Sequence, residues 1–421
     1  MNLFLYNFLV FMMLPFMVAR IFIKSFSDAD YKLNFLNRFG IYKNKNQSKN
    51  VVWFHAVSLG EVISSEKIVS QILKDYKVVL SVSTPTGLRE AQKIFGSKLE
   101  VVYAPWDFIF FVSLFFKTYR PQALILFETE IWPSMIFKAH SVKIPIVISN
   151  GRLSKKSFNR YKKLSFITTK TMKKISFIFA QSSNHKKRFH RLGVPLEKIK
   201  EVGSAKFDYD IYNNGINVNN KDRQIILAAS THKKEDELII AAFKRLSFDM
   251  PEVELIIVPR HPERAKSIQN LLDIEGMNSE VLTSIPNNKN KNKNKNKISI
   301  ISATGILKEL YPLASIAFIG GSLFKEYGGH NVIEAASQKC PFIVGPYTYN
   351  FEDVILKFKE NESCVQLDIN LDIFNAFKTL LSDNNLRDNM ANKALDVCIK
   401  NTGSSDIQYN NILNIIREDK S

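Results

Sequence analysis

A carboxylate stands where an apolar strand is expected to turn into a helix, at Glu61 in the run Trp53-Phe-His-Ala-Val-Ser-Leu-Gly-Glu61. The strand is expected over Val51–Phe54, and small residues with Gly60 follow it. Such a turn lies at the carboxyl edge of a parallel sheet, where α/β proteins bind their ligands. Glu61 is therefore placed to act on a ligand in a cleft. The alternative is that its charge only stabilises the helix N-terminus.

The second half of the chain carries a glycine-rich turn between apolar strands. The pattern of strand, turn, helix and strand is read from three runs: Ala317–Ser322, Tyr327–Glu334 and Cys340–Pro346. Gly328 and Gly329 allow the backbone to approach a phosphate, and a helix that opens at His330 or Asn331 offers free N–H groups. Glu334, one turn into that helix, is placed to accept hydrogen bonds from ribose hydroxyls.

Polar side chains also follow two other expected strands of the second half. Arg260 and His261 come after the apolar run Val253–Val258. A guanidinium presents a rigid fork to phosphate, and an imidazole can donate to a phosphate or ribose oxygen. Ser230 and Thr231 end a similar run, and they are either hydroxyl donors to a ligand or helix caps.

The motifs call for no metal or other cofactor. Two Asp-x-Asp pairs, Asp28–Asp30 and Asp208–Asp210, have the spacing of a sugar-nucleotide metal site, but neither follows a strong buried strand. The three cysteines are odd in number, widely spaced and without metal-ligand spacing. Neither a zinc site nor a disulfide framework is expected, and a reducing cytoplasm suits the chain.

A net charge of +18 over 421 residues favours an anionic partner, such as a phosphorylated substrate or a membrane. Part of the excess is compositional, because the chain is rich in Lys, Asn and Ile, and residues 287–297 alternate Asn and Lys almost without interruption. That run is expected to loop out without packing. A nucleic-acid partner is not expected, because the aromatic residues do not interleave with a basic stripe.

The first segment predicts a membrane anchor over residues 1–24. Leu3 to Ala19 carry no charge, and the first basic residues follow them. Seventeen helical residues reach about 25 Å, just short of a hydrocarbon core of about 30 Å. The positive-inside rule then keeps the body of the protein cytoplasmic. A buried N-terminal helix is the alternative.

The rest of the chain alternates short apolar runs with helix-like charged segments, which predicts an α/β protein with two βαβ-type domains. The expected domains are residues 25–208 and 224–421, joined by a linker over 209–223. A binding site is expected in the cleft that the two domains face.

The chain resembles the bacterial Kdo transferases, which move 3-deoxy-D-manno-octulosonic acid (Kdo) from CMP-Kdo to the lipid A precursor. Ten motifs occur in the family's order: Trp53–Glu61, Ser83–Gly87, Tyr103–Asp107, Glu128–Pro133, Asn150–Ser154, Gly203–Asp208, Ala229–His232, Val258–Arg264, Gly320–Glu334 and Asn350–Asp353. The resemblance implies a GT-B fold, with an acceptor-binding first domain and a CMP-Kdo-binding second domain. It also implies transfer to lipid IVA in lipopolysaccharide synthesis, at the cytoplasmic face of the inner membrane.

The resemblance implies roles for single residues as well. Glu61 matches the general base of an inverting displacement, and Glu130 and Lys206 match residues that assist at the transition state. Glu128, two residues before Glu130, is expected to point to the other side if the strand continues that far, and to be structural. The implied CMP-Kdo contacts are Arg260, His261, Gly305, Ile306, Leu307, Asn331, Val332, Ile333 and Glu334.

Three positions depart from the family pattern. Ile306 replaces an acid that is common near the nucleotide, so a side-chain contact there is lost while backbone contacts from Gly305 to Leu307 can remain. Tyr347 stands where His is common, and Gly151 where Ala is common. The alternative functions are a sugar-nucleotide epimerase, which also pairs two Rossmann-like domains, and a membrane-anchored basic protein that binds nucleic acid.

Overall fold

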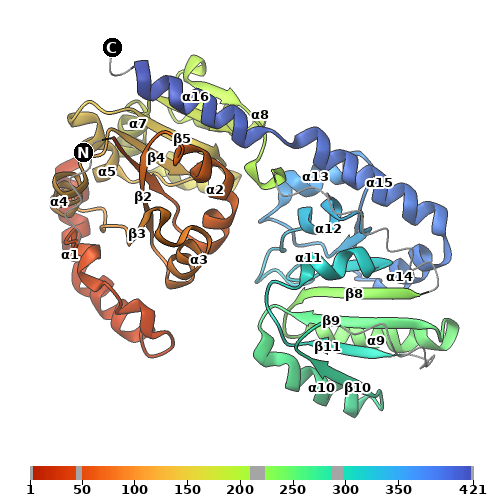
Figure 1. Ribbon diagram of the computed structural model, residues 1–421. Helices are drawn as coiled ribbons and strands as arrows, with labels where there is room; N and C mark the ends of the chain where they lie inside the picture. Colours follow the sequence, from red (N-terminus) through yellow and green to blue (C-terminus); the bar gives the residue numbers. More distant parts are fainter. Residues whose placement is uncertain (1–2, 44–49, 209–222, 286–296, 419–421) are drawn as a thin grey trace. The chain divides into compact units, whose positions relative to one another are not determined.

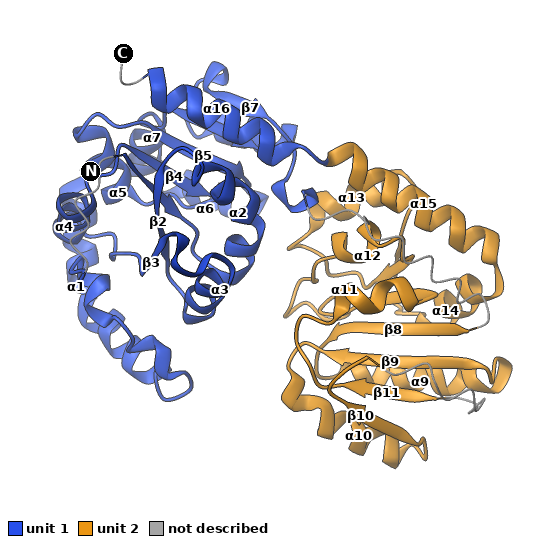
Figure 2. Ribbon diagram, in the orientation of Figure 1, with its two compact units in different colours: residues 1–208, 402–421 blue, residues 209–401 orange. Residues whose placement is uncertain are grey.

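The computed structural model describes residues 3–43, 50–208, 223–285 and 297–418. The chain forms two compact units, residues 1–208 with 402–421 and residues 209–401 (Figure 2). Each unit contains one seven-stranded sheet with helices packed against it, so the chain has the expected α/β class (Figure 1). The expected linker, except for Arg223, and most of the Asn-Lys run lie outside the described residues.

The first unit has a parallel sheet with the strand order β3-β2-β1-β4-β5-β6-β7. Its strands are β1 Val51–His55, β2 Lys77–Val82, β3 Glu100–Tyr103, β4 Ala123–Phe127, β5 Ile146–Gly151, β6 Phe177–Ala180 and β7 Ile199–Glu201. Its helices are α1 Leu3–Lys24, α2 Leu59–Ile72, α3 Pro85–Phe95, α4 Ile109–Tyr119, α5 Pro133–Ser141, α6 Lys155–Lys163, α7 Ser165–Met172, α8 Ser183–Arg191 and α16 Ser404–Glu418.

The second unit repeats the plan with the order β10-β11-β9-β8-β12-β13-β14, again with parallel pairing. Its strands are β8 Gln224–Thr231, β9 Val253–Pro259, β10 Ser279–Leu282, β11 Ile298–Ile301, β12 Ile316–Ile319, β13 Phe342–Val344 and β14 Val365–Gln366. Its helices are α9 Glu235–Asp249, α10 Ala265–Ile274, α11 Leu307–Leu310, α12 Ile333–Ser337, α13 Glu352–Glu360, α14 Ile373–Ser382 and α15 Asn384–Asn401.

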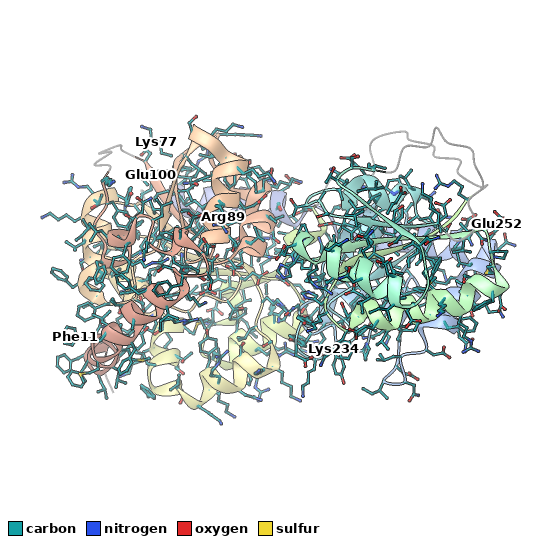
Figure 3. All side chains as sticks on the ribbon, turned by 90° about the horizontal axis from the view of Figure 1, so that it is seen from below. Phe11, Lys77, Arg89, Glu100, Lys234 and Glu252 are labelled. Carbon is teal, nitrogen blue, oxygen red and sulfur yellow. The ribbon has the colours of Figure 1, made fainter. Side chains whose placement is uncertain are left out.

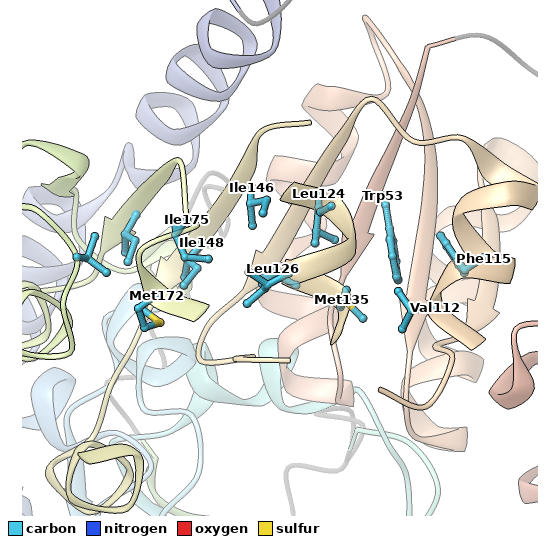
Figure 4. Packing of buried hydrophobic residues seen from close by; sticks show 14 of the residues in the cluster. Trp53, Val112, Phe115, Leu124, Leu126, Met135, Ile146, Ile148, Met172 and Ile175 are labelled. Atoms are coloured by element: carbon cyan, nitrogen blue, oxygen red, sulfur yellow. The ribbon is translucent and has the colours of Figure 1, made fainter. Parts of the chain in front are cut away.

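The continuous apolar runs of the strands have a direct structural cause. All five residues of β1 and all five of β4 are buried, because helices cover both faces of the sheet. On one face Trp53 stacks on Phe115 of α4 with ring centroids 3.8 Å apart (Figure 4). On the other face Val52 and Phe54 pack with residues of α2, α3 and α16.

The C-terminal segment corrects the expected domain boundary. Residues 402–421 belong to the first unit, although the sequence placed them in the second domain (Figure 2). Asp208 accepts hydrogen bonds from the backbone N–H groups of Gly403 and Ser405, each at 2.5 Å, and so caps the start of α16. A carboxylate at a helix N-terminus is electrostatically favourable. Helix α16 therefore belongs to the same unit as α1.

Helix α1 spans 22 residues and is long and apolar enough to cross a membrane by length and composition. Only two of its described residues, Asn7 and Ile21, are buried. The alternative of a buried core helix is therefore wrong, because most of the helix surface faces solvent.

Because one face of α16 is buried, a substitution on that face should destabilise the first unit. Ile412→Ala removes a fully buried side chain and should lower the free energy of unfolding by about 2–5 kcal/mol. Ile407→Ala, at a 40% exposed position of the same helix, is the control and should change it by about 0.5 kcal/mol or less. All three tryptophans lie in the first unit, so urea unfolding followed by their fluorescence reports on it. Equal effects of the two substitutions would contradict the docking of α16.

Candidate active site

The carboxyl ends of β1 and β4 define the candidate site of the first unit. The two strands are neighbours, and the strand order reverses between them. Parallel sheets bind ligands at such a switch point, because the loops that leave the two strands diverge there. The loop after β1 leads to Glu61 in the first turn of α2, and the loop after β4 carries Glu128 and Glu130.

The Glu61 carboxylate is held on both of its oxygens. The backbone N–H of Val57 donates to Oε2 at 2.8 Å, and the Ser58 hydroxyl donates to Oε1 at 2.9 Å. Glu61 therefore does bind the backbone at the helix start, as the capping interpretation requires. However, burial, together with the charges of Glu128 and Glu130, raises its pKa to about 8. A carboxyl group with a pKa near neutrality is suited to proton transfer, which a simple cap does not need.

Glu130 occupies a similar environment. Its pKa is raised to about 7, mainly by burial, while a hydrogen bond from Trp132 acts in the opposite direction. The indole Nε1 donates to Glu130 Oε2 at 2.5 Å. The Trp132 ring in turn packs perpendicular to buried His55, with centroids 5.6 Å apart. Burial lowers the pKa of His55 to about 4, so this imidazole is neutral and does not compete for the carboxylate charge.

Glu128 corrects the expectation that it points away from the site. Strand β4 ends at Phe127, and Glu128 adopts a left-handed backbone with φ of 60°, so the side-chain alternation of a strand stops there. Its carboxylate pairs with Lys206 at 3.1 Å, and both side chains are more than four-fifths buried. Burial opposes ionisation of Glu128, but the charges of Lys206 and Arg152 outweigh it and lower the pKa. Lys206 therefore lies at the site, where its positive charge neutralises Glu128.

Two buried amides, Asn150 and Gln408, position this ion pair. Asn150 belongs to one of the family motifs, but no such role was expected of it, and the sequence patterns did not identify Gln408. Asn150 Oδ1 accepts from the N–H of Ala205, the residue before Lys206, at 3.0 Å. Gln408 of α16 accepts from the Ser149 hydroxyl at 2.7 Å and from the Asn150 N–H at 2.8 Å. The carbonyl of Ser149 accepts from the N–H of Glu128 at 2.9 Å. The C-terminal helix therefore supports both partners of the ion pair.

The second unit has its own switch point, between β8 and β12. The buried carboxylate of Glu235 accepts hydrogen bonds from the backbone N–H groups of His232, Gly321, Ser322 and Leu323, at 2.7–3.0 Å. Gly321 has φ of 68°, and a Cβ on Gly320 would lie 2.4 Å from the carbonyl oxygen of Ser230. The two glycines are required by this close approach of the β12 turn to the end of β8.

Aromatic and imidazole rings gather beside that turn. His232 and His330 share a hydrogen bond between their Nε2 atoms at 2.7 Å, and the Tyr327 ring stacks on His232 at 3.8 Å. His261 lies next to them, 5.9 Å from His232 between ring centroids. Burial and the neighbouring Arg260 and histidine charges lower the pKa of His330 to about 3 and that of His232 to about 4. The pair is neutral at physiological pH.

The expected nucleotide contacts all follow strands at the same edge of the second sheet. Arg260 and His261 follow β9 and are exposed. Gly305, with φ of 78°, and Ile306 come directly before α11, and Leu307 is the first residue of that helix. Helix α12 begins at Ile333, later than the expected His330 or Asn331, because Asn331 Oδ1 accepts from the Ile333 N–H at 3.1 Å. Val332 and Ile333 are buried, so only their backbone can reach a ligand. Asn331 donates to Glu334 at 3.1 Å.

The three described aspartates of the two Asp-x-Asp pairs are engaged elsewhere. Asp28 and Asp30 both bind Arg89, and Asp208 caps α16. Asp210 lies outside the described residues. Within the described ranges no group of three or more His, Cys, Asp or Glu side chains could hold a metal ion.

Two parallel-sheet units, each with polar groups at its switch point, define the GT-B class of glycosyltransferase fold. Solved structures support this class. A glycosyltransferase from Rickettsia africae superposes with a TM-score of 0.60 at 14% identity, over 89% of this chain and 99% of that chain. The UDP-GlcNAc 2-epimerase from Neisseria meningitidis gives a TM-score of 0.58 at 15% identity, over 86% of this chain and all of that one. At these identities the likeness concerns the fold alone.

Sequence comparison identifies the family. Residues 34–209 match the family model of 3-deoxy-D-manno-octulosonic-acid transferase (kdotransferase). The 3-deoxy-D-manno-octulosonic acid transferase of Haemophilus influenzae is 32% identical over 95% of this chain and 96% of its own length. That of Rickettsia bellii is 29% identical over 91% and 92%. The chain belongs to the Kdo transferase family of glycosyltransferases.

The electrostatics of the glutamate cluster predict an unusual titration. The pKa of Glu61 should be about 8, well above that of an ordinary glutamate, and ¹³C NMR of carboxyl-labelled glutamate reads this directly. Glu130→Gln removes one of the neighbouring charges that raise the pKa of Glu61, so the titration should move to lower pH. Glu66→Gln, at an exposed position of α2, is the matched control and should leave it in place. A Glu61 signal that titrates near pH 4.5 in the parent protein would contradict the description.

Proposed function

We propose that the protein transfers Kdo from CMP-Kdo to a hydroxyl group of the lipid A precursor, lipid IVA, by an inverting displacement. The observation that carries the proposal is the Glu61 carboxylate, which is held at the switch point of the first sheet with a pKa near 8. A general base works best when its pKa lies near the operating pH. Membership of the Kdo transferase family supports the choice of sugar.

In the proposed reaction the oxygen of the acceptor hydroxyl bonds to the anomeric carbon of Kdo, and Glu61 takes the proton of that hydroxyl. The bond from that carbon to the phosphate oxygen breaks, and the electron pair leaves with CMP. Positive charge that develops on the sugar ring would be stabilised by Glu130, a nearby carboxylate. Lys206 would meet the acidic sugar while its ion pair with Glu128 keeps the lysine in place.

The donor half of the proposal rests on the second unit. Arg260 would bind the single phosphate of CMP-Kdo, and His261 would donate to a phosphate or ribose oxygen. Backbone groups of Gly305 to Leu307 would contact the nucleotide, so Ile306 can stand where an acid is common. Glu334 and its hydrogen-bond partner Asn331 would bind the ribose. The neutral His232–His330 pair offers a further N–H donor without adding charge.

The acceptor half implies a membrane. A lipid-linked acceptor presents its sugar at the bilayer surface, and the apolar helix α1 belongs to the unit that carries Glu61. We propose the cytoplasmic face of the inner membrane as the location, with no metal and no nucleic acid taking part.

Replacement of the base tests the proposal most directly. Glu61→Gln should lower turnover by about 10²–10⁴ and leave binding of CMP-Kdo and lipid largely intact, because Gln keeps the shape but cannot accept a proton. In the parent protein the rate should rise as pH increases through about 8, since only the ionised carboxylate is a base. Mass spectrometry of the lipid product measures both effects, with Glu66→Gln as the control. Preserved turnover with a lower melting temperature would assign Glu61 to helix capping instead.

The donor assignment has a separate test. Arg260→Ala should weaken binding of CMP about ten- to a hundredfold, the usual effect of losing one charge-assisted hydrogen bond. Lys266→Ala, an exposed cation on α10 of the same unit, should leave the affinity unchanged. Calorimetric titration with CMP measures both variants. If Arg260→Ala binds CMP as the parent does, the nucleotide site lies elsewhere.

A further inference from the structure

Helix α1 is attached to the first unit near its N-terminal end. The Tyr6 hydroxyl donates to Asp107 Oδ2 at 2.8 Å. Asn7 is buried, and its Oδ1 accepts from the Ile109 N–H at 2.6 Å and from the Ser134 hydroxyl at 3.2 Å. Asp107 is itself buried and also accepts from the N–H groups of Ser134 and Met135. The first two turns of α1 are thus bonded into the loops that open α4 and α5.

The other end of α1 is attached to the same unit. Ile21 is buried, and the Phe22 ring packs against Phe35 with centroids 5.9 Å apart. The residues that follow the helix are tied to α3, since Asp28 and Asp30 both pair with Arg89. The two attached ends are fifteen residues, or about 22 Å of helix, apart.

These attachments conflict with a helix that crosses a bilayer. The hydrocarbon core is about 30 Å thick, so nearly all of α1 would have to leave the unit in order to span it. Withdrawal would remove hydrogen-bond partners from buried Asp107 and from the partly buried Ile109 N–H, and it would carry the Asn7 amide into hydrocarbon. Each such loss is unfavourable, because a buried polar group then lacks its partner.

The exposed surface of α1 is strongly apolar. We call this surface the aromatic face, and its exposed side chains are Phe4, Phe8, Leu9, Phe11, Met12, Met13, Phe16, Phe22, Ile23 and Phe26, with Phe110 of α4. Phe4 is 81% exposed and Phe110 is 60% exposed. Figure 3 shows Phe11 at the outer edge of the unit. An exposed apolar surface of this extent marks an interaction site.

Positive charge accompanies the aromatic face. Helix α6 reads Lys-Lys-Ser-Phe-Asn-Arg-Tyr-Lys-Lys, which is five basic residues and no acidic one. Its Tyr161 interacts electrostatically with Tyr6, so α6 lies near the attached N-terminal end of α1. Lys32 lies over the rings of Phe22 and Phe26 at the other end, 5.6 Å from each centroid. Basic residues near an anionic leaflet strengthen binding to it, and exposed phenylalanines insert at its boundary.

We infer that α1 lies in the plane of the membrane interface, with its aromatic face in an anionic lipid surface, and does not cross the bilayer. Both ends of the helix then remain on the side of the catalytic units. The inference deepens the membrane contact of the proposed function. Its tests measure topology and lipid binding, and none of them measures turnover. The in-plane inference can therefore fail while the transferase proposal stands, and the transferase proposal can fail while the inference stands.

The first test is the side on which the N-terminus lies. The full chain carries an epitope tag and a protease site ahead of Met1, and sealed inverted inner-membrane vesicles are treated with the protease. An in-plane helix exposes the tag, so cleavage should be complete without detergent. A tag at the C-terminus is the control for access, and a periplasmic marker is the control for sealing. Protection of the N-terminal tag until detergent is added would show a spanning helix and overturn the inference.

The second test removes the aromatic face. The triple variant Phe8→Ser, Phe11→Ser and Phe16→Ser should bind phosphatidylglycerol-containing vesicles about tenfold or more weakly in a flotation assay. Phe248→Ser, at an 81% exposed position of α9 in the second unit, is the matched control and should bind as the parent does. Lys155→Gln with Lys156→Gln should weaken binding to anionic but not to neutral vesicles. If the triple variant binds the vesicles as tightly as the parent does, the membrane assignment is wrong. It is also wrong if the parent forms a dimer in detergent-free buffer and the triple variant does not, because the aromatic face is then a contact between two copies of the chain.

Discussion

The charges of Glu61, Glu128, Glu130 and Lys206, at the carboxyl edge of the first sheet, determine the protonation states of the candidate site. Lys206 lies 3.1 Å from Glu128 and neutralises it, so that carboxylate stays ionised although it is buried. Glu61 and Glu130 then face burial and a neighbouring negative charge, and their pKa values rise to about 8 and about 7. Because Lys206 and Arg152 keep Glu128 ionised, its negative charge adds to burial in raising the pKa of Glu61.

The backbone carries strain at the same edge. Glu128, just after β4, and Asn150, one residue before the end of β5, adopt the left-handed region, which is unfavourable for residues with a Cβ by about 1–2 kcal/mol each. Hydrogen bonds offset this cost. The Asn150 N–H donates to Gln408, and the Asn150 side chain accepts from Ala205. The C-terminal helix is therefore part of the support of the glutamate cluster, which explains why the chain returns to the first unit.

At the switch point of the second sheet, a buried carboxylate holds two backbone segments together. The β12 turn must come close to the end of β8, and Glu235 holds it there through four backbone N–H groups. Its histidine pair is kept neutral by burial and by the charge of Arg260, so the imidazoles add donors but no further positive charge. Ser230, at the end of β8, also adopts a left-handed backbone, which parallels Glu128 and Asn150.

Local sequence determined much of this protein. Apolar runs such as Val51–Phe54 predicted buried parallel strands, because side chains covered on both faces leave no polar alternation. Glu61 was identified from its place after such a run, since the strand-to-helix turn is itself a local feature. The apolar character of α1 was equally plain.

Tertiary structure decided the features that depend on residues far apart in the chain. The pairing of Glu128 with Lys206 joins positions 78 residues apart. The expectation that Glu128 points away was wrong, because alternation assumes a strand that in fact ends at Phe127. The return of α16 depends on Asp208 and Gln408, whose partners are not their sequence neighbours. Apolar composition likewise made α1 a candidate to cross a membrane, whereas the contacts of Tyr6 and Asn7 are visible only once α4 and α5 are folded beside it. Composition and periodicity record what each segment buries, but long-range polar pairing depends on which loops the fold brings together.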